Sequence, residues 1–162
     1  MQHQWHVAIS STADIVIARQ NGRALAKELG FGGSDLTLIA TAISEVARNI
    51  VEHARCGEII MAPSHRGHQH GISIVARDRG PGIPDVQQAM QYGYSTCRGL
   101  GAGLPGAKWL MDEFNIDSTV GQGTTVTMKK WGPQVLASQF SKTRSIPTNE
   151  AAAGTSGYGR SP

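Results

Sequence analysis

Residues 71–82 read GISIVARDRGPG, a run of apolar and β-branched residues that ends in an aspartate, two glycines and a proline. The apolar part of the run predicts a β-strand. Asp78 then places a carboxylate at the strand end, and Gly80 and Gly82 let the backbone approach a flat ligand closely because they carry no Cβ atom. Aspartate, glycine and proline also make ordinary strand-ending turns. This stretch taken alone is compatible with either a binding site or a turn.

The sequence on both sides of this run predicts helices packed on one sheet. Apolar residues recur at helical spacing in stretches that predict helices at residues 13–29 and 35–54 and a third from residue 104 to residue 111 or 113. Five β-like runs predict strands at residues 5–9, 58–62, 71–77, 114–118 and 124–129. Residues 63–70 are polar and predict the loop of a hairpin, and residues 81–103 predict a long loop. We therefore expect an α+β fold, a two-layer sandwich with helices packed on one face of a mixed, mostly antiparallel sheet.

The composition indicates one globular domain. The chain has 162 residues, of which 40% are hydrophobic and 17% are charged, and this fits a single hydrophobic core. After Trp131 the sequence turns to small polar residues, so we expect a domain over residues 1–132 and a disordered tail over residues 133–162. The two cysteines, Cys56 and Cys97, form no CxxC pair and follow no signal peptide. No apolar run reaches the roughly 20 residues that span a bilayer, and we expect a cytoplasmic protein without a membrane segment.

The distribution of charge does not favour binding to nucleic acid. The formal net charge is +3, and three basic residues against one acidic residue follow Trp131, so the expected domain is nearly neutral. A nucleic-acid surface needs a basic stripe interleaved with aromatic residues, and the sequence shows none. We therefore expect no nucleic-acid partner.

Glu45 and Asn49 are four residues apart in the second predicted helix, so their side chains meet on one face. The Asn49 oxygen is a neutral hard ligand that suits Mg²⁺, an ion that binds nucleotide phosphates at the same time. The Glu45 carboxylate can accept a proton from an attacking hydroxyl or water. The alternative is that the pair belongs to a solvated helix face.

Residues 98–106 read RGLGAGLPG and precede the third predicted helix. Free backbone amides and the positive end of a helix dipole both favour a phosphate there. Gly101, Gly103 and Gly106 match the GxGxxG pattern of dinucleotide-binding folds, but the run does not follow a hydrophobic strand. The P-loop pattern also fails, because Ala and Lys follow Gly106 where Lys and Ser or Thr are required. Phosphate binding by another architecture remains open.

Three histidines, His65, His68 and His70, lie in the predicted hairpin loop. Structural zinc sites combine histidine with cysteine, and neither a cysteine nor an acidic residue lies close to these histidines in the sequence. We therefore do not expect a metal site in this loop.

Four motifs follow one another along the chain: Glu45-x-x-x-Asn49, Asp78-x-Gly80-x-Gly82, the run from Gly99 to Gly106, and Gly121-x-Gly123-Thr124-Thr125. The ordered set resembles the ATP-binding boxes of the GHKL superfamily, which includes histidine kinases, gyrase-type ATPases and anti-sigma-factor serine kinases. Within this superfamily, residues 41–50 and 103–114 are most similar to the RsbT-type switch kinases of the stressosome. The resemblance covers nearly all of residues 5–131.

The resemblance implies a Bergerat-type α/β sandwich that holds Mg²⁺ and ATP between helices and a flexible lid. It implies that Asn49 holds the magnesium and that Glu45 is the general base. Asp78 is then expected to bind the adenine amine, in a pocket shaped by Gly80 and Gly82. The other implied ATP contacts are Arg98, Gly99, Gly101 and Gly103 at the phosphates, Leu104 next to them, and Thr124 on the adenine side.

The resemblance also implies partners. In this family the acceptor is a serine of a STAS-domain antagonist protein, and phosphorylation adds about −1.5 to −2 charges to its docking surface. The released kinase then binds and activates a PP2C-type phosphatase. The alternative is a nucleotide-gated anti-sigma factor or binding switch in which phosphoryl transfer is secondary. A histidine kinase is disfavoured because no helix pair carries an acceptor histidine, and a gyrase-like ATPase because its second domain is missing.

Overall fold

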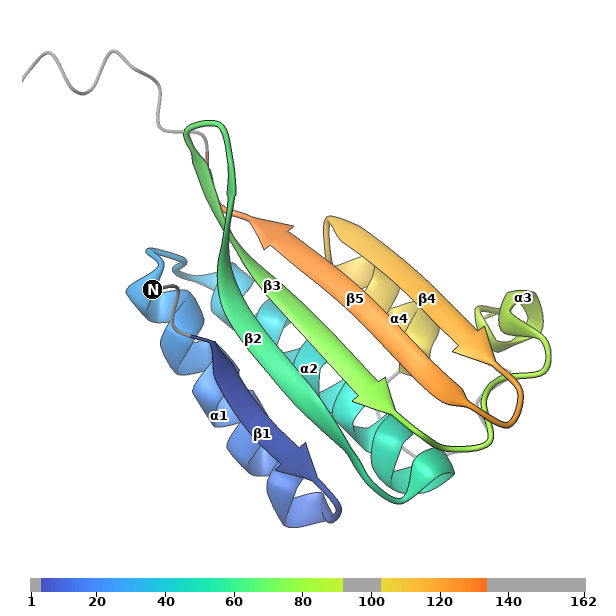
Figure 1. Ribbon diagram of the computed structural model, residues 1–162. Helices are drawn as coiled ribbons and strands as arrows, with labels where there is room; N and C mark the ends of the chain where they lie inside the picture. Colours follow the sequence, from blue (N-terminus) through green and yellow to red (C-terminus); the bar gives the residue numbers. More distant parts are fainter. Residues whose placement is uncertain (1–3, 92–102, 134–162) are drawn as a thin grey trace, which may run out of the picture.

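A five-stranded sheet forms the centre of the computed structural model, which describes residues 4–91 and 103–133 (Figure 1). The strands are β1 (Trp5–Ile9), β2 (Gly57–Arg66), β3 (Gln69–Asp78), β4 (Glu113–Thr119) and β5 (Gly123–Trp131). They lie in the order β1-β2-β3-β5-β4, and each neighbouring pair is antiparallel. All five predicted strands are confirmed, and all the described strand pairs are antiparallel.

Helices cover one face of this sheet, which confirms the predicted two-layer α+β fold (Figure 1). They are α1 (Thr12–Glu28), α2 (Ser34–Asn49) and α4 (Gly103–Leu110). A π-helical turn, η1 (Ile50–Ala54), continues α2, and the short helix α3 (Val86–Ala89) lies within the predicted long loop. In the two described ranges, none of the helices has the length and apolarity that crossing a membrane requires. The predicted tail falls almost entirely outside these ranges and stays a prediction.

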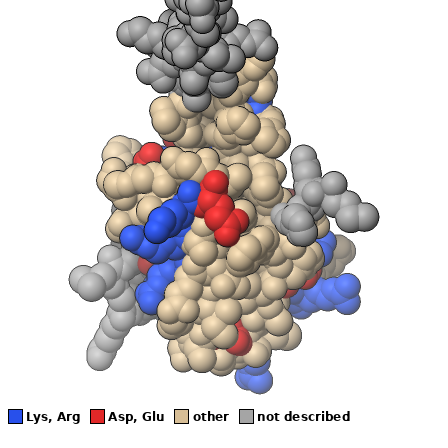
Figure 2. All heavy atoms as spheres, turned by 90° about the vertical axis from the view of Figure 1, so that its left-hand side faces the viewer, with Lys and Arg blue, Asp and Glu red and all other residues tan. Residues whose placement is uncertain are grey.

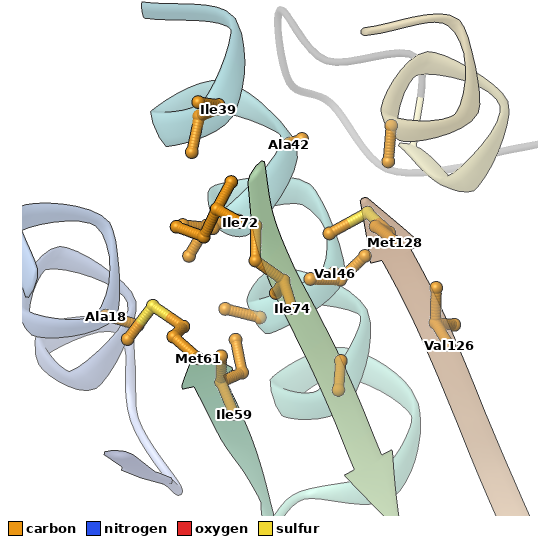
Figure 3. Packing of buried hydrophobic residues seen from close by; sticks show 14 of the residues in the cluster. Ala18, Ile39, Ala42, Val46, Ile59, Met61, Ile72, Ile74, Val126 and Met128 are labelled. Atoms are coloured by element: carbon orange, nitrogen blue, oxygen red, sulfur yellow. The ribbon is translucent and has the colours of Figure 1, made fainter. Parts of the chain in front are cut away.

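The core lies between the central strands and α2 (Figure 3). Successive strand residues point to opposite faces of a sheet, and the helix-facing set is buried: Ile59, Met61, Ile72, Ile74, Val126 and Met128. The predicted apolar stripe of α2 continues into η1, meets this set and is also buried: Leu36, Ile39, Ile43, Val46 and Ile50. Burial of each such side chain contributes about 1.5–3 kcal/mol. This packing fixes α2, and therefore the polar residues at its C-terminal end, relative to the sheet.

The hairpin between β2 and β3 is longer than the sequence predicts. The expected loop at residues 63–70 is wrong, because β2 runs to Arg66 and β3 begins at Gln69. Gly67 has a φ of 59° in the tight turn between them, a conformation that glycine adopts readily. Figure 1 shows this end of the hairpin projecting beyond the other strands, so polar side chains can occupy strand positions on both of its faces.

Two of the hairpin histidines pair across the strands. His65 lies opposite His70, and their ring centroids are 4.9 Å apart in an edge-to-face arrangement. Within residues 4–91 and 103–133, no group of three or more His, Cys, Asp and Glu side chains has an arrangement that could hold a metal ion.

The side of the molecule formed by α1 and β1 carries charges of both signs (Figure 2). Helix α1 exposes Arg19, Arg23 and Lys27 at intervals of four residues, which places them in one row. On the helix-free face of the sheet, Arg77 donates a hydrogen bond from Nε to Glu58 Oε1 at 2.9 Å. This hydrogen bond lowers the pKa of Glu58. Basic side chains therefore lie among acidic ones on this side of the molecule.

Candidate functional site

Glu45 and Asn49 lie one turn apart at the C-terminal end of α2. Glu45 is only 6% exposed, whereas Asn49 is half-buried. The regular helix ends at Asn49, and η1 begins with the next residue. Short π-helical turns are rare and occur frequently at functional sites. The two predicted residues therefore share one helix face next to an irregular turn.

Both oxygens of the Glu45 carboxylate accept hydrogen bonds. Oε1 accepts from Arg48 Nη1 at 2.9 Å, and Oε2 accepts from the backbone N–H of Gly103 at 3.1 Å. Gly103 is the first residue of α4, so the carboxylate also satisfies one of the free amides at that helix end. These bonds offset the cost of burying a charged group. Arg48 was not predicted from the sequence, although its three-residue spacing from Glu45 is a signal for such a pair.

Asp78 joins the end of β3 to the start of β5. Its Oδ1 atom accepts hydrogen bonds from the N–H of Gly80 at 2.8 Å and from the N–H of Thr124 at 3.2 Å. No residue in the described ranges donates a hydrogen bond to Oδ2. The side chain is half-buried, so Oδ2 can accept a hydrogen bond from a ligand.

Thr124 belongs to a small network of hydroxyl groups. It is 5% exposed, and its Oγ1 atom lies 2.9 Å from Ser118 Oγ on the neighbouring strand β4. Ser118 Oγ also accepts a hydrogen bond from the N–H of Ile83 at 2.8 Å. The Ser118 hydroxyl donates a hydrogen bond to the carbonyl oxygen of Gly123 at 3.2 Å. Ser118 was not predicted from the sequence; its position directly across the sheet from Thr124 depends on the pairing register.

The glycines near Asp78 are required by close contacts within the protein. A Cβ atom on Gly80 would lie 2.6 Å from Cβ of Ala54, at the end of η1. A Cβ atom on Gly82, where φ is 76°, would lie 2.5 Å from the carbonyl oxygen of Thr119. The loop after β3 therefore packs against the turn that follows Asn49 and against the β4–β5 turn. Whether these glycines also shape a ligand pocket stays a prediction.

The fold thus brings the predicted residues into two groups at one end of the domain. Glu45 contacts Gly103, and Asp78 contacts Gly80 and Thr124. Asn49 is linked to the second group through η1, whose last residue meets Gly80. Leu104 is 5% exposed and belongs to the hydrophobic core. The other predicted phosphate contacts, Arg98, Gly99 and Gly101, lie outside the described residues.

The combination of groups suits a nucleotide. Asp78 offers a free acceptor for an exocyclic amine, and the carboxamide of Asn49 offers an oxygen that suits a magnesium ion. Glu45 uses two of the roughly four lone-pair positions of a carboxylate, so it can still accept a proton. This end of the domain therefore offers groups that suit a nucleobase, a phosphate-bound cation and a reacting hydroxyl group.

Comparisons with known proteins identify the family of the chain. Residues 10–130 match the family described as the histidine kinase-like ATPase domain. The serine/threonine-protein kinase RsbT of Bacillus subtilis (strain 168) is 53% identical over 132 residues, which make up 81% of this chain and 98% of that protein. The anti-sigma F factor of Geobacillus stearothermophilus is 30% identical over 136 residues, with coverage of 80% and 93%.

One solved structure is a more distant match. It is the histidine kinase domain of the blue-light activated histidine kinase EL346 from Erythrobacter litoralis, with 19% sequence identity and a TM-score of 0.44. The match covers 74% of this chain and 59% of that chain.

Proposed function

The chain belongs to the family of histidine kinase-like ATPase domains, and on this premise we propose that it is a protein serine/threonine kinase. The observation that carries the proposal is the placement of Glu45 and Asn49 on one face of α2, at the same end of the domain as Asp78. The 53% identity to a serine/threonine kinase over 98% of its length supports the same reaction.

ATP and Mg²⁺ are the proposed cofactors. Asp78 Oδ2 accepts a hydrogen from the 6-amino group of adenine, and Thr124 lies beside it. The Asn49 oxygen holds the magnesium ion, which neutralises charge on the phosphates. The backbone amides of the glycine run, with Arg98, bind the phosphates, and Leu104 anchors the end of this run in the core. These roles rest on the family membership and on the two groups of contacts.

Glu45 is the proposed general base. Phosphoryl transfer depends mainly on positioning and charge neutralisation, so the base has to orient the acceptor hydroxyl and remove its proton. Arg48 and the Gly103 amide hold the two carboxylate oxygens in fixed positions. The serine hydroxyl of the substrate gives its proton to Glu45 as its oxygen forms the bond to the γ-phosphorus, and ADP leaves.

The proposed substrate is a serine on a STAS-domain antagonist protein. Phosphorylation changes the charge of that serine by about −1.5 to −2, which weakens docking of the antagonist. The released kinase then activates a PP2C-type phosphatase in a stress-response pathway. We place this reaction in the cytoplasm and assign it to residues 1–132, with residues 133–162 as a tail outside the kinase domain.

The similarity to an anti-sigma F factor favours a second candidate function. That relative shares 30% identity over 93% of its length. In this alternative, nucleotide binding controls a complex with a sigma factor or another partner, and phosphoryl transfer is secondary.

Incubation of the full chain with labelled ATP, Mg²⁺ and purified STAS-domain proteins separates the two candidates. A kinase labels a serine of the STAS protein, whereas a binding switch forms a complex without labelling it. Glu45→Gln should lower transfer by about 10²–10⁴-fold with little change in ATP affinity. The matched control is Glu52→Gln, because Glu52 is an exposed glutamate of η1, and it should transfer normally. Full transfer by Glu45→Gln would show that Glu45 is not the base.

A further inference from the structure

Ser118 is a half-buried residue of β4 whose hydroxyl group has no role in the proposed function. Its hydroxyl oxygen has three polar neighbours: the N–H of Ile83 at 2.8 Å, the hydroxyl of Thr124 at 2.9 Å and the carbonyl oxygen of Gly123 at 3.2 Å. These neighbours come from the loop after β3 and from the first two residues of β5. One side chain on β4 therefore ties together the segments that surround Asp78.

The donor and acceptor capacity of a serine decides the direction of these bonds. A serine hydroxyl donates once and accepts twice. The Ile83 N–H can only donate, and the Gly123 carbonyl oxygen can only accept. If all three contacts are hydrogen bonds, Ser118 gives its single proton to Gly123 and accepts from Ile83 and Thr124. The Thr124 hydroxyl must then be the donor in its bond to Ser118.

This direction fixes what Thr124 can offer to a ligand. With its proton bound to Ser118, Thr124 Oγ1 has only acceptor lone pairs left. Asp78 accepts the Thr124 N–H with its Oδ1 atom, and its Oδ2 atom is an acceptor as well. At position 6 of a purine, an amino group presents hydrogens to these acceptors, whereas an oxygen presents a third acceptor.

We propose that Ser118 is a specificity-determining positioning residue, which holds Thr124 as an acceptor and so favours 6-amino over 6-oxo purine nucleotides. The inference rests on the proposed ATP site. Two contacts carry it: the Ser118 hydroxyl is hydrogen-bonded to the Thr124 hydroxyl, and the Thr124 N–H is hydrogen-bonded to Asp78. Without Ser118, the Thr124 hydroxyl can rotate and donate its proton to an oxygen at position 6.

The test compares the affinities of the full chain for ATP and for inosine triphosphate, measured by calorimetry. Inosine triphosphate has an oxygen at position 6 and, unlike guanosine triphosphate, has no 2-amino group that could donate to Asp78 or Thr124. The wild type should bind ATP at least about tenfold more tightly, since an unpaired buried acceptor costs roughly 1–3 kcal/mol. In Ser118→Ala, the preference for ATP should fall about three- to tenfold.

Three further variants separate specificity from structure. Ser118→Thr keeps the hydroxyl and should keep the preference. Ser73→Ala should keep it too, because Ser73 is a half-buried serine of β3 that pairs with Lys129 away from the site. Thr124→Val removes the acceptor itself and should lower the preference even if Ser118→Ala does not fold.

Two outcomes overturn the inference in different ways. If Ser118→Ala weakens both nucleotides by the same factor, or leaves the preference unchanged, Ser118 does not determine specificity although the ATP site stands. If the wild type binds neither nucleotide, the proposed function fails and the inference with it.

Discussion

Gly123→Ala should strongly destabilise the domain and disturb the candidate site. Gly123 has a φ of 118°, and a Cβ atom there would lie 2.1 Å from the carbonyl oxygen of Asp78 and 2.8 Å from Cα of Arg79. Both neighbours are backbone atoms, so no side-chain rotation can relieve the contact. The conformation alone costs about 1–3 kcal/mol for a residue other than glycine, and overpacking adds about 1–3 kcal/mol. The expected total is about 2–6 kcal/mol, a large part of the 5–15 kcal/mol that typically stabilises a domain.

Gly121 provides a matched control on the same turn. Its φ is 81°, and a Cβ atom there would meet nothing within 4 Å. Gly121→Ala should therefore lose only about 1–2 kcal/mol, from the backbone conformation. The difference between the two variants measures the contact with the end of β3.

Urea unfolding of the full chain, followed by circular dichroism, is the assay. With a typical slope of about 2 kcal/mol per molar urea, an extra 2 kcal/mol in Gly123→Ala moves its midpoint about 1 M below that of Gly121→Ala. Gly123→Ala should also bind ATP more weakly, because the clash displaces Asp78. Equal midpoints for the two variants would refute the close approach of β5 to Asp78.

Three other predictions concern stability. Ile43→Ala should lower the free energy of unfolding by about 2–5 kcal/mol, since Ile43 is fully buried. Ile17→Ala, at an exposed position of α1, should change it by less than about 0.5 kcal/mol. The urea midpoints of the two variants measure both changes. Arg48→Met leaves the buried Glu45 carboxylate without its cation and should lower the same free energy by about 1–3 kcal/mol; no change in the midpoint would contradict that pairing. The hydrogen bond from Arg77 lowers the pKa of Glu58 from its ordinary value of 4.5. The ionised Glu58 carboxylate therefore stabilises the fold above pH 4.5, and this stabilisation is lost as the pH falls through the lowered pKa. Glu58→Gln should therefore unfold more easily than the wild type at pH 7, and the two midpoints should converge in acid.

Local patterns explain why most of the fold could be predicted from the sequence. The stripe from Leu36 to Ile50 repeats at helical spacing, and the structure buries it. Strand runs such as Ile72 to Ala76 are rich in β-branched residues. Polarity misled the prediction at residues 63–70, because polar side chains also fit the projecting end of a hairpin, where His65, Arg66 and His70 are exposed strand residues.

The candidate site was less predictable because its contacts depend on register. Nothing local indicates that Ser118 lies opposite Thr124, or that the Gly103 amide reaches Glu45. The order of the motifs indicated that Asp78 and Thr124 belong to one site, and the structure brings them into contact. The roles of these residues toward ATP remain proposals.

The strand order has a consequence for how the protein is made. β3 pairs on one side with β2, its neighbour in the chain, and on the other with β5, which is the last of the described strands to be synthesised. Until β5 emerges from the ribosome, the edge of β3 is open, and unpaired edges of apolar strands promote aggregation. The contacts that complete the site span 46 residues from Asp78 to Thr124 and 58 residues from Glu45 to Gly103. A nascent chain that ends before β5 therefore contains most of the core but lacks the Asp78–Thr124 contact. If such a chain is released from the ribosome, it should aggregate rather than bind a nucleotide.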